Sequence, residues 1–494
     1  MAFFTVQTLG CKVNQYDGAA LAAALGAAGL RPATEGEGDP AGAATVGLIV
    51  VNTCCVTATA MAKSRQALRR ALRRAPGAAV LVTGCYADYD GDRLRGLLAS
   101  LGVAPDRAIV AGHGDDPAGQ VRQLALTVLQ QGARPSEANR RHPAAGGCGG
   151  NEGWMSAGTS LAAGAATADI RTRRREAVKR NRPAAGSLPP ISAFPGHQRA
   201  FVKVQDGCDA FCAYCVVPYT RPVVAWRPIE VVQAECRGLL RAGHREIVLC
   251  GVFLGAYGRA TAIRRRWDKA PSLLPQLVRR VGELEGLFRL RLSSLEPLDL
   301  TEELLESFRA TPTAAWHFHL PLQSGSGRIL RRMNRQYTPD DFRRAIGRVR
   351  AACPDAAVTT DILVGFPGEG DSDFRATLEV ARCAGFSKIH AFPFSPIGGT
   401  AAWSYRREAP PPAVVRARMT ELAALERELA AAFRRRFVGR TVEALVERPS
   451  RAAAPGQALT DRYLTVFFSD AGPRPGEVAS FRITDVNDDG LVGR

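Results

Sequence analysis

The chain has 494 residues, enough for about three domains of ordinary size. Hydrophobic residues make up 46% of it and charged residues 23%, a composition that excludes disorder along the whole chain. Because 65 Lys and Arg residues outnumber 47 Asp and Glu residues, the net charge is +18. Such an excess favours a polyanionic partner such as nucleic acid; a basic but merely solvated surface is the alternative.

Neither a leader peptide nor a membrane span is expected. The first seven residues lack a basic segment and a long apolar segment. The longest apolar run, residues 46–51, has the length of a strand and falls far short of the ~18 residues of a membrane span. We therefore expect a cytoplasmic protein whose twelve cysteines stay reduced. Clustered cysteines then indicate metal ligands, redox groups or nucleophiles.

Residues 1–134 alternate short apolar strands with Ala-rich helices. The pattern predicts strands at 3–8, 46–52 and 79–83, and helices at 17–30 and 58–74. Strands followed by helices predict a parallel sheet with helices on its faces. The continuous apolar strands fit burial on both faces of that sheet.

Residues 135–197 interrupt this alternation. They are rich in Gly, Ala, Pro and Arg without a sustained apolar period, which predicts a flexible insertion or linker. Within it, the segment from Arg171 to Arg182 carries seven basic residues and one acid, Glu176. This basic arm is either an RNA-binding segment or a solvated disordered run, and the sequence does not separate the two.

Residues 198–436 return to strand–helix alternation. Strands are predicted at 200–204, 246–249, 289–292, 317–320, 358–362 and 388–391. Six such units predict a partial βα barrel of the TIM type, followed by a helix at 414–436 whose apolar stripe packs on the core. Residues 437–494 contain short strands at 442–446, 464–468 and 478–483, which predict a small β-barrel of the kind that binds oligonucleotides. The predicted fold class is α/β with this β-barrel at its C-terminus.

Cys208, Cys212 and Cys215 form a CxxxCxxC motif just after the first predicted barrel strand. Three thiolates do not complete a four-ligand zinc site, whereas they suit a 4Fe-4S cluster with one iron left open. That iron can bind the amino and carboxylate groups of S-adenosylmethionine. Tyr214 lies where an aromatic ring can pack near the adenine. A partial zinc knuckle is the alternative.

Cys11, Cys54 and Cys85 each follow a predicted strand of the N-terminal sheet. Because the carboxyl ends of parallel strands meet at one edge, these cysteines can come together and hold a second cluster. Three ordinary buried cysteines are the alternative. Cys55 would point away from Cys54 along a strand-like segment and is predicted to be a core residue, although the pair leaves open which one is the ligand.

The other cysteines show no metal-ligand spacing, and three histidines lie at or near predicted barrel strands. We predict ordinary small residues at Cys148, Cys236, Cys250, Cys353 and Cys383. We predict hydrogen-bonded core histidines at His317, His319 and His390.

The cysteine motif and its flank, Lys203-Val204-Gln205-Asp206-Gly207-Cys208, resemble the radical S-adenosylmethionine superfamily and, within it, the methylthiotransferases. The segment Gly10-Cys11-Lys12-Val13-Asn14 is similar to the MtaB-type branch, which acts on N6-threonylcarbamoyladenosine next to the tRNA anticodon. The resemblance covers nearly the whole chain outside 135–197. It implies two 4Fe-4S clusters, S-adenosylmethionine, a tRNA anticodon arm, a flavodoxin- or ferredoxin-like electron donor, and a TRAM-like RNA-binding domain at 437–494.

Further segments that match the family lie at the carboxyl ends of predicted barrel strands, where βα barrels build their sites. The resemblance implies that S-adenosylmethionine is bound there by Tyr214, Gly251, Ser294, Glu296, Gln323, Gly365 and Gly368. Tight turns are the alternative for the glycines, and a salt bridge at the strand end is the alternative for Glu296.

The chain departs from the family pattern after Cys215. Pro222 follows Arg221 where the family has Gly, Trp226 precedes Arg227 where Ser is usual, and Phe253 replaces a polar residue. These differences bear on substrate contacts or cofactor handling, and they leave every predicted cluster ligand in place.

The resemblance implies transfer of a methylthio group to C2 of N6-threonylcarbamoyladenosine. The two clusters have separate tasks, since one carries the sulfur and the other cleaves S-adenosylmethionine to a radical that removes the C2 hydrogen. Two alternatives of the same class act on isopentenyladenosine in tRNA or on an aspartate of a ribosomal protein. An alternative of another class is a non-catalytic iron-sulfur protein that binds RNA.

Overall fold

The computed structural model describes most of the chain. The described residues are 2–33, 46–113, 119–120, 123–125, 190–268, 271–448, 455–469 and 472–494. The basic arm between Arg171 and Arg182 lies outside them, as does Cys148. Within the described ranges, no helix combines the length and the apolar character needed to cross a membrane.

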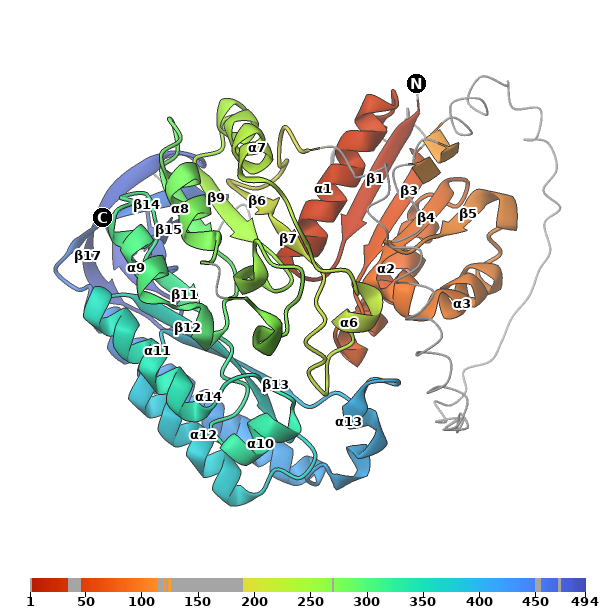
Figure 1. The fold of residues 1–494 in the computed structure, drawn as a ribbon. Coiled ribbons are helices and arrows are strands. Elements are labelled where there is room, and N and C mark those ends of the chain that lie inside the picture. Colours follow the sequence, from red (N-terminus) through yellow and green to blue (C-terminus); the bar gives the residue numbers. More distant parts are fainter. Residues whose placement is uncertain are drawn as a thin grey trace.

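The N-terminal part is a five-stranded parallel sheet in the order β2-β1-β3-β4-β5. Its strands are β1 (Phe3–Thr8), β2 (Arg31–Pro32), β3 (Val46–Thr53), β4 (Ala79–Gly84) and β5 (Ala108–Val110). The helices are α1 (Lys12–Ala27), α2 (Ala58–Arg74) and α3 (Cys85–Ser100), with the short η1 (Pro105–Arg107) before β5. Helix α1 packs on one face of the sheet and helices α2 and α3 pack on the other, as predicted (Figure 1).

Helix α1 begins five residues earlier than predicted and ends before residue 30. Cys11 occupies its N-cap without a side-chain hydrogen bond to the first turn, so the usual capping signal for a helix start is missing. Gly29, with φ +92°, follows the end of the helix. The early start places Cys11 at the helix N-terminus instead of in a loop.

The middle part is a six-stranded partial βα barrel, as predicted. Its strands are β6 (Arg199–Lys203), β9 (Glu246–Cys250), β10 (Arg289–Leu292), β11 (His317–His319), β12 (Ala357–Val364) and β13 (Lys388–Pro393). They form two three-stranded parallel sheets, β10-β9-β6 and β11-β12-β13. Parallel bridges from Leu290 to Ala314 and from Ser294 to His319 join the two sheets.

Helices and short elements cover the outside of the barrel and its carboxyl ends. The helices are α6 (Val217–Thr220), α7 (Ile229–Arg241), α8 (Leu274–Gly282), α9 (Glu302–Arg309), α10 (Gly327–Arg332), α11 (Pro339–Ala352), α12 (Asp371–Ala384) and α13 (Ala401–Ser404). The short elements are β7 (Gln205–Asp206), β8 (Ala225–Trp226), η2 (Leu254–Ala256), η3 (Arg264–Arg266), η4 (Pro297–Asp299) and η5 (Arg406–Glu408). Helix α14 (Pro412–Arg435) packs against β13 and α12, and Leu422 and Phe433 of its apolar stripe are buried, as predicted.

The C-terminal part is a closed five-stranded barrel in the order β14-β15-β16-β18-β17. Its strands are β14 (Thr441–Glu447), β15 (Gly456–Thr460), β16 (Thr465–Phe468), β17 (Val478–Val486) and β18 (Leu491–Gly493). The sequence predicted three of them. Strands β15 and β18 are short and contain glycine, so their local strand signal is weak.

Helix α1 also packs against β6, so the N-terminal sheet lies beside the open edge of the barrel (Figure 1). The hydroxyl of Tyr16 in α1 donates a hydrogen bond of 2.8 Å to Glu235 of α7. Val13, Tyr16 and Ala20 of α1 belong to the same apolar core as the barrel strands. This packing brings the carboxyl edge of the N-terminal sheet toward the loop with the CxxxCxxC motif.

Candidate metal centres at the domain junction

The three N-terminal cysteines lie at the ends of three neighbouring strands. Cys11 follows β1, Cys54 follows β3, and Cys85 follows β4 as the first residue of α3. Cys54 and Cys85 are buried, whereas Cys11 is exposed. Burial and the nearby Cys85 and Cys11 all raise the pKa of the Cys54 thiol. The strand order therefore gathers the three thiols at one edge.

Close packing and polar contacts shape this edge. Gly10 has φ +102°, and a Cβ there would lie 2.9 Å from Cys54 Sγ, so a larger residue would push into the thiol. Asn14 Nδ2 donates to the carbonyls of Leu9 (2.5 Å) and Thr53 (3.2 Å), which ties α1 to the strand ends. Cys54 N donates to Ser64 Oγ at 3.1 Å.

Cys55 points into the core under α2 and α3, as predicted. Its thiol donates a hydrogen bond of 3.2 Å to the carbonyl oxygen of Cys85. The adjacent Cys54 lies with Cys11 and Cys85, so this geometry favours Cys54 over Cys55 as a ligand.

The loop of the CxxxCxxC motif is held by main-chain hydrogen bonds on both sides. Gly207 has φ +75°, and a Cβ there would lie 1.8 Å from the carbonyl oxygen of Val223, so only glycine fits. Cys208 N donates to the carbonyl of Arg221 at 3.0 Å. Asn334 Nδ2 donates to the carbonyls of Ala210 (3.1 Å) and Phe211 (2.9 Å).

A buried arginine, Arg335, lies against this loop. Its Nη1 is 3.2 Å from Cys212 Sγ and 3.4 Å from the hydroxyl of Tyr214. Its Nη2 donates to both carboxylate oxygens of Glu296, at 2.5 and 2.6 Å. Sequence patterns do not predict Arg335, because it follows the motif by more than a hundred residues and has no characteristic spacing from it.

The polar residues predicted to bind the cofactor lie at the carboxyl ends of β10 and β11. Glu296 forms a salt bridge with Arg335, which was the alternative to cofactor binding for this residue. Through Arg335, Glu296 is also linked to Cys212. Ser294 pairs with His319 across the joint between the two sheets. Gln323 has φ +58° and pairs through its main chain with Asp361 and Leu363.

The predicted glycines sit in close packing and turns. A Cβ on Gly251 would lie 2.9 Å from Gln205 Oε1, and one on Gly365 would lie 2.6 Å from Val415 Cγ2. Gly368 has φ +83° and donates its N–H to the carbonyl of Glu408. These contacts alone account for glycine at all three positions, and contact with S-adenosylmethionine remains a prediction.

One of the three histidine predictions is wrong. His390 is exposed: it shares one face of β13 with Lys388 and Phe392, which are exposed as well, and its ring centroid lies 5.9 Å from that of His319. His317 is buried and shares a 3.1 Å contact with Thr359 Oγ1, but its Nδ1 has no hydrogen-bond partner. His319 is half-buried, with Nε2 3.3 Å from Asp361 Oδ2.

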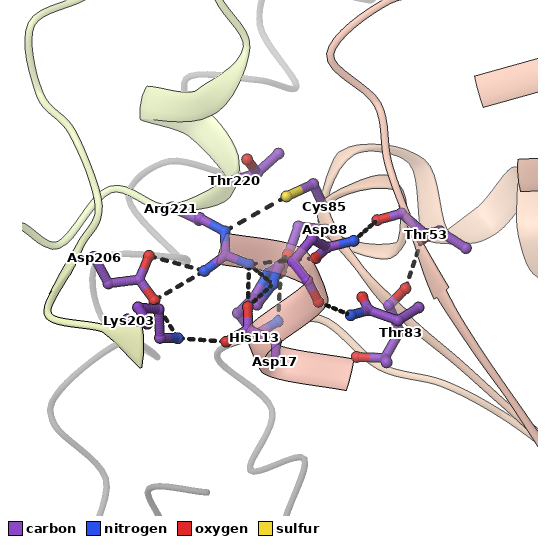
Figure 2. A network of polar contacts seen from close by, with 12 residues as sticks. Asp17, Thr53, Thr83, Cys85, Asp88, His113, Lys203, Asp206, Thr220 and Arg221 are labelled. Atoms are coloured by element: carbon purple, nitrogen blue, oxygen red, sulfur yellow. Dashed lines mark hydrogen bonds and ion pairs between the residues drawn. The ribbon is translucent and has the colours of Figure 1, made fainter. Parts of the chain in front are cut away.

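A buried polar network fills the junction between the two cysteine sites (Figure 2). Arg221 Nη2 lies 2.5 Å from Asp17 Oδ2 and 2.5 Å from His113 Nε2, and its Nη1 lies 2.8 Å from Asp206 Oδ1. Lys203 Nζ contacts the same two aspartates at 2.5 and 2.8 Å. The network joins α1 of the N-terminal sheet to the segment around the cysteine loop.

The network also contacts a predicted ligand, because Arg221 Nε is 3.5 Å from Cys85 Sγ. A hydrogen bond with Cys55 and the charges of Arg221 and His113 hold the pKa of the Cys85 thiol well below its usual value, against the effect of burial. By contrast, burial raises the pKa of Cys54 and that of Cys215 to about 12 each. Thiolate, the metal-binding form, is thus favoured at Cys85.

Both cysteine sets fit a 4Fe-4S cluster by the chemistry of their donors. Each supplies three thiols, and in each an arginine N–H points at a sulfur: Arg221 at Cys85 and Arg335 at Cys212. Across the described ranges, no three His, Cys, Asp or Glu side chains are arranged as ligands of a single metal ion. A 4Fe-4S cluster is larger than a single metal ion, so its cysteine ligands lie further apart than the ligands of one ion do.

Comparisons with protein-family models match three segments of the chain. The Radical SAM superfamily matches residues 202–381, the Uncharacterized protein family UPF0004 matches residues 4–101, and the TRAM domain matches residues 435–494. The first segment covers most of the βα barrel and ends before β13, the second covers most of the N-terminal sheet and ends before β5, and the third contains the whole C-terminal β-barrel.

Curated relatives match over nearly the full length. The chain is 32% identical to the threonylcarbamoyladenosine tRNA methylthiotransferase MtaB of Chlamydia pneumoniae, over 99% of this chain and 97% of that protein. It is 30% identical to the Bacillus subtilis protein of the same name, over 98% and 94%. It is also 32% identical to the tRNA-2-methylthio-N(6)-dimethylallyladenosine synthase of Paracoccus denitrificans, over 99% and 96%.

Among solved structures, the fold is similar to that of the radical S-adenosylmethionine methyltransferase TsrM from Kitasatospora setae. The TM-score is 0.51 at 15% identity, covering 81% of this chain and 74% of that one. At this identity the likeness concerns the fold alone.

Proposed function

We propose that this chain, which belongs to the methylthiotransferase family of radical S-adenosylmethionine enzymes, transfers a methylthio group to C2 of N6-threonylcarbamoyladenosine beside the tRNA anticodon. The observation that carries the proposal is the meeting of two three-cysteine sites at one domain junction. A radical enzyme that inserts sulfur needs both an electron source and a separate sulfur source. The relatives named for threonylcarbamoyladenosine support the choice of base.

Six cysteines are the proposed ligands of two 4Fe-4S clusters. When bound, the cluster on Cys208, Cys212 and Cys215 would supply the electron that cleaves S-adenosylmethionine, and the cluster on Cys11, Cys54 and Cys85 would carry the sulfur. The chain's own groups hold these sites in place: Arg335 donates to Cys212, and Arg221 donates to Cys85.

The proposed cofactor site lies at the carboxyl ends of the barrel strands. Tyr214, Glu296 and Arg335 form one contact network beside Cys212, which places a carboxylate, a cation and an aromatic ring next to the cysteine loop. We propose that S-adenosylmethionine is bound at this end of the barrel by Tyr214, Gly251, Ser294, Glu296, Gln323, Gly365 and Gly368.

The proposed macromolecular partner is the anticodon arm of tRNA. The net charge of +18 and the match to the TRAM domain support an RNA partner. Bases in an anticodon loop are unpaired, so they can be presented to a site outside a helix. A flavodoxin- or ferredoxin-like protein is the proposed electron donor.

A second substrate, N6-isopentenyladenosine in tRNA, has a specific observation in its favour. The Paracoccus denitrificans relative named for dimethylallyladenosine is as similar, at 32% identity, as the relative named for threonylcarbamoyladenosine from Chlamydia pneumoniae. The two bases differ in their N6 group, so the modified nucleoside itself separates the two functions.

The test is mass spectrometry of tRNA nucleosides from cells lacking this protein, with rescue by wild type or by Cys212→Ala. We expect 2-methylthio-N6-threonylcarbamoyladenosine to disappear and to return with wild type only. Loss of 2-methylthio-N6-isopentenyladenosine instead would establish the second substrate. Unchanged levels of both, in cells without a redundant enzyme, would reject a tRNA substrate and direct the search to ribosomal proteins.

A further inference from the structure

We propose that Arg221 is a positioning residue that couples the two cysteine sites and raises the reduction potential of the cluster on Cys11, Cys54 and Cys85. This inference rests on the two-cluster site of the proposed function. Arg221 contacts one site through its side chain and the other through its main chain.

The side chain of Arg221 reaches the N-terminal site. Its Nε lies 3.5 Å from Cys85 Sγ (Figure 2). Its Nη2 lies 3.5 Å from Asn14 Oδ1. Asn14 is the residue that ties the end of β1 to the end of β3. The guanidinium therefore contacts both a ligand and the scaffold that holds the strand ends together.

The main chain of Arg221 contacts the radical site. Its carbonyl oxygen accepts the N–H of Cys208 at 3.0 Å, which places the first cysteine of the CxxxCxxC motif. The carbonyl oxygens of Val223 and Arg221 leave no room for a side chain at Gly207. The turn at Cys208 is therefore packed directly against residues 221–223. A displacement of Arg221 would therefore move this turn.

The guanidinium is held from several directions at once. Asp206 accepts two contacts of 2.8 Å from Nη1, and Asp17 and His113 contact Nη2. The side chain of Arg221 is only 4% exposed, so these contacts are formed in a site of low dielectric constant. A planar fork with five N–H donors can serve all these partners, which a lysine ammonium cannot.

A buried cation whose N–H points at a ligand sulfur stabilises the more negative, reduced state of a cluster. Hydrogen bonds to sulfur and local charge are among the factors that set cluster potentials. Loss of the guanidinium should therefore shift the midpoint of the N-terminal cluster to a more negative potential. Lys203 provides a matched control. It contacts the same two aspartates, Asp17 and Asp206, but in the described part of the chain it forms no hydrogen bond with a cysteine sulfur.

The experiment uses the full chain with Cys208→Ala, Cys212→Ala and Cys215→Ala, so that reconstitution with iron and sulfide loads only the N-terminal site. Redox titration followed by electron paramagnetic resonance then gives the midpoint of this single cluster. The same background is prepared with Arg221→Met, with Arg221→Lys and with Lys203→Met. Circular dichroism checks the folding of each variant.

We expect Arg221→Met to shift the midpoint to a more negative potential and to speed loss of iron to a chelator by at least tenfold. Arg221→Lys should shift the midpoint in the same direction by less, and it serves as the test if Arg221→Met does not fold. Lys203→Met removes an equal charge but no contact with a cysteine sulfur, so it should shift the midpoint by less than Arg221→Met does. Equal shifts in the Arg221 and Lys203 variants, or an unchanged midpoint in a folded Arg221 variant, would overturn the proposal. A background that binds no cluster at all would instead reject the two-cluster function itself.

Discussion

At the scale of single residues, the two cysteine sites resemble each other in one respect that their sequences do not share. In each, a buried arginine that is paired with a carboxylate also donates to a cysteine sulfur. Arg221 pairs with Asp17 and Asp206, and Arg335 pairs with Glu296. The cysteines of one site could be predicted from their local spacing, and those of the other from their place after predicted strands. The contacts of the two arginines with sulfur are evident only in the folded chain.

The Arg335–Glu296 pair provides a test at this scale. Arg335→Met leaves the Glu296 carboxylate, only 15% exposed, without its partner, so we expect a loss of about 3 kcal/mol in the free energy of unfolding. Arg332→Met is the matched control, because the Arg332–Glu408 pair is 33% and 53% exposed and should contribute less than about 1 kcal/mol. Urea denaturation followed by tryptophan fluorescence measures both. Equal effects of the two variants would contradict the assignment of a buried pair at Arg335.

At the scale of secondary-structure elements, the strands and helices follow from local patterns, but the joints between them do not. The longer apolar strands and the helices α2 and α14 were predicted from spacing, whereas no bounds were predicted for the helices of the barrel. One joint that was not predicted lies between α10 and α12, where Ser326, the N-cap of α10, donates to Asp373 of α12 at 2.6 Å. Asp373 also accepts from Gly370 N at 2.9 Å and from Arg328.

This joint predicts a pH-dependent contribution to stability. Although burial opposes it, hydrogen bonds from Arg328, Ser326 and Gly370 lower the pKa of Asp373 below its usual value. A carboxyl whose pKa is lower in the folded state stabilises the fold above its unfolded pKa of about 3.9, and the contribution is lost as pH falls through the folded pKa. We expect Asp373→Asn to cost about 1.5–3 kcal/mol at pH 7, and the difference from wild type to shrink as pH falls below about 3.9.

Urea midpoints measured from pH 7 to pH 3 would show whether the two curves converge. Asp340→Asn is the control, because the Asp340 side chain is 72% exposed and its pair with Arg343 lies on the surface of α11. It should change stability by less than about 0.5 kcal/mol at pH 7. A constant difference between Asp373→Asn and wild type across this range would contradict the role of the charge.

At the scale of the whole molecule, the C-terminal barrel docks on the amino ends of β9 and β10, away from the cysteine sites at the carboxyl ends. Glu246 accepts from Arg289 Nη1 at 3.1 Å and from Arg291 Nε at 2.6 Å. The same arginines donate to main-chain carbonyls of the C-terminal barrel, including Leu459 at 2.8 Å and Asp461 at 2.7 Å. The buried carboxylate of Glu246 therefore orients both arginines that join the βα barrel to the C-terminal barrel.

Glu246→Gln tests this joint. The substitution keeps the volume but leaves two buried arginines without a counter-charge, so we expect a loss of about 3–5 kcal/mol. We also expect faster proteolysis in the 436–440 connection between α14 and β14. Glu447→Gln is the control, because its pair with Arg199 joins the same two parts but is 19% and 29% exposed. If both variants unfold and are cleaved like wild type, Glu246 does not hold the joint.

The sequence by itself determined the α/β class, the partial barrel, most of the strands and the two groups of cysteines. These follow from hydrophobic period and from spacing, which depend on neighbours along the chain. Only the tertiary structure decided the start of α1 at Lys12, the exposure of His390 on an edge strand, and the burial of Arg221 between the two sites. Those outcomes depend on how segments that are distant in the sequence pack against one another, which no local pattern encodes.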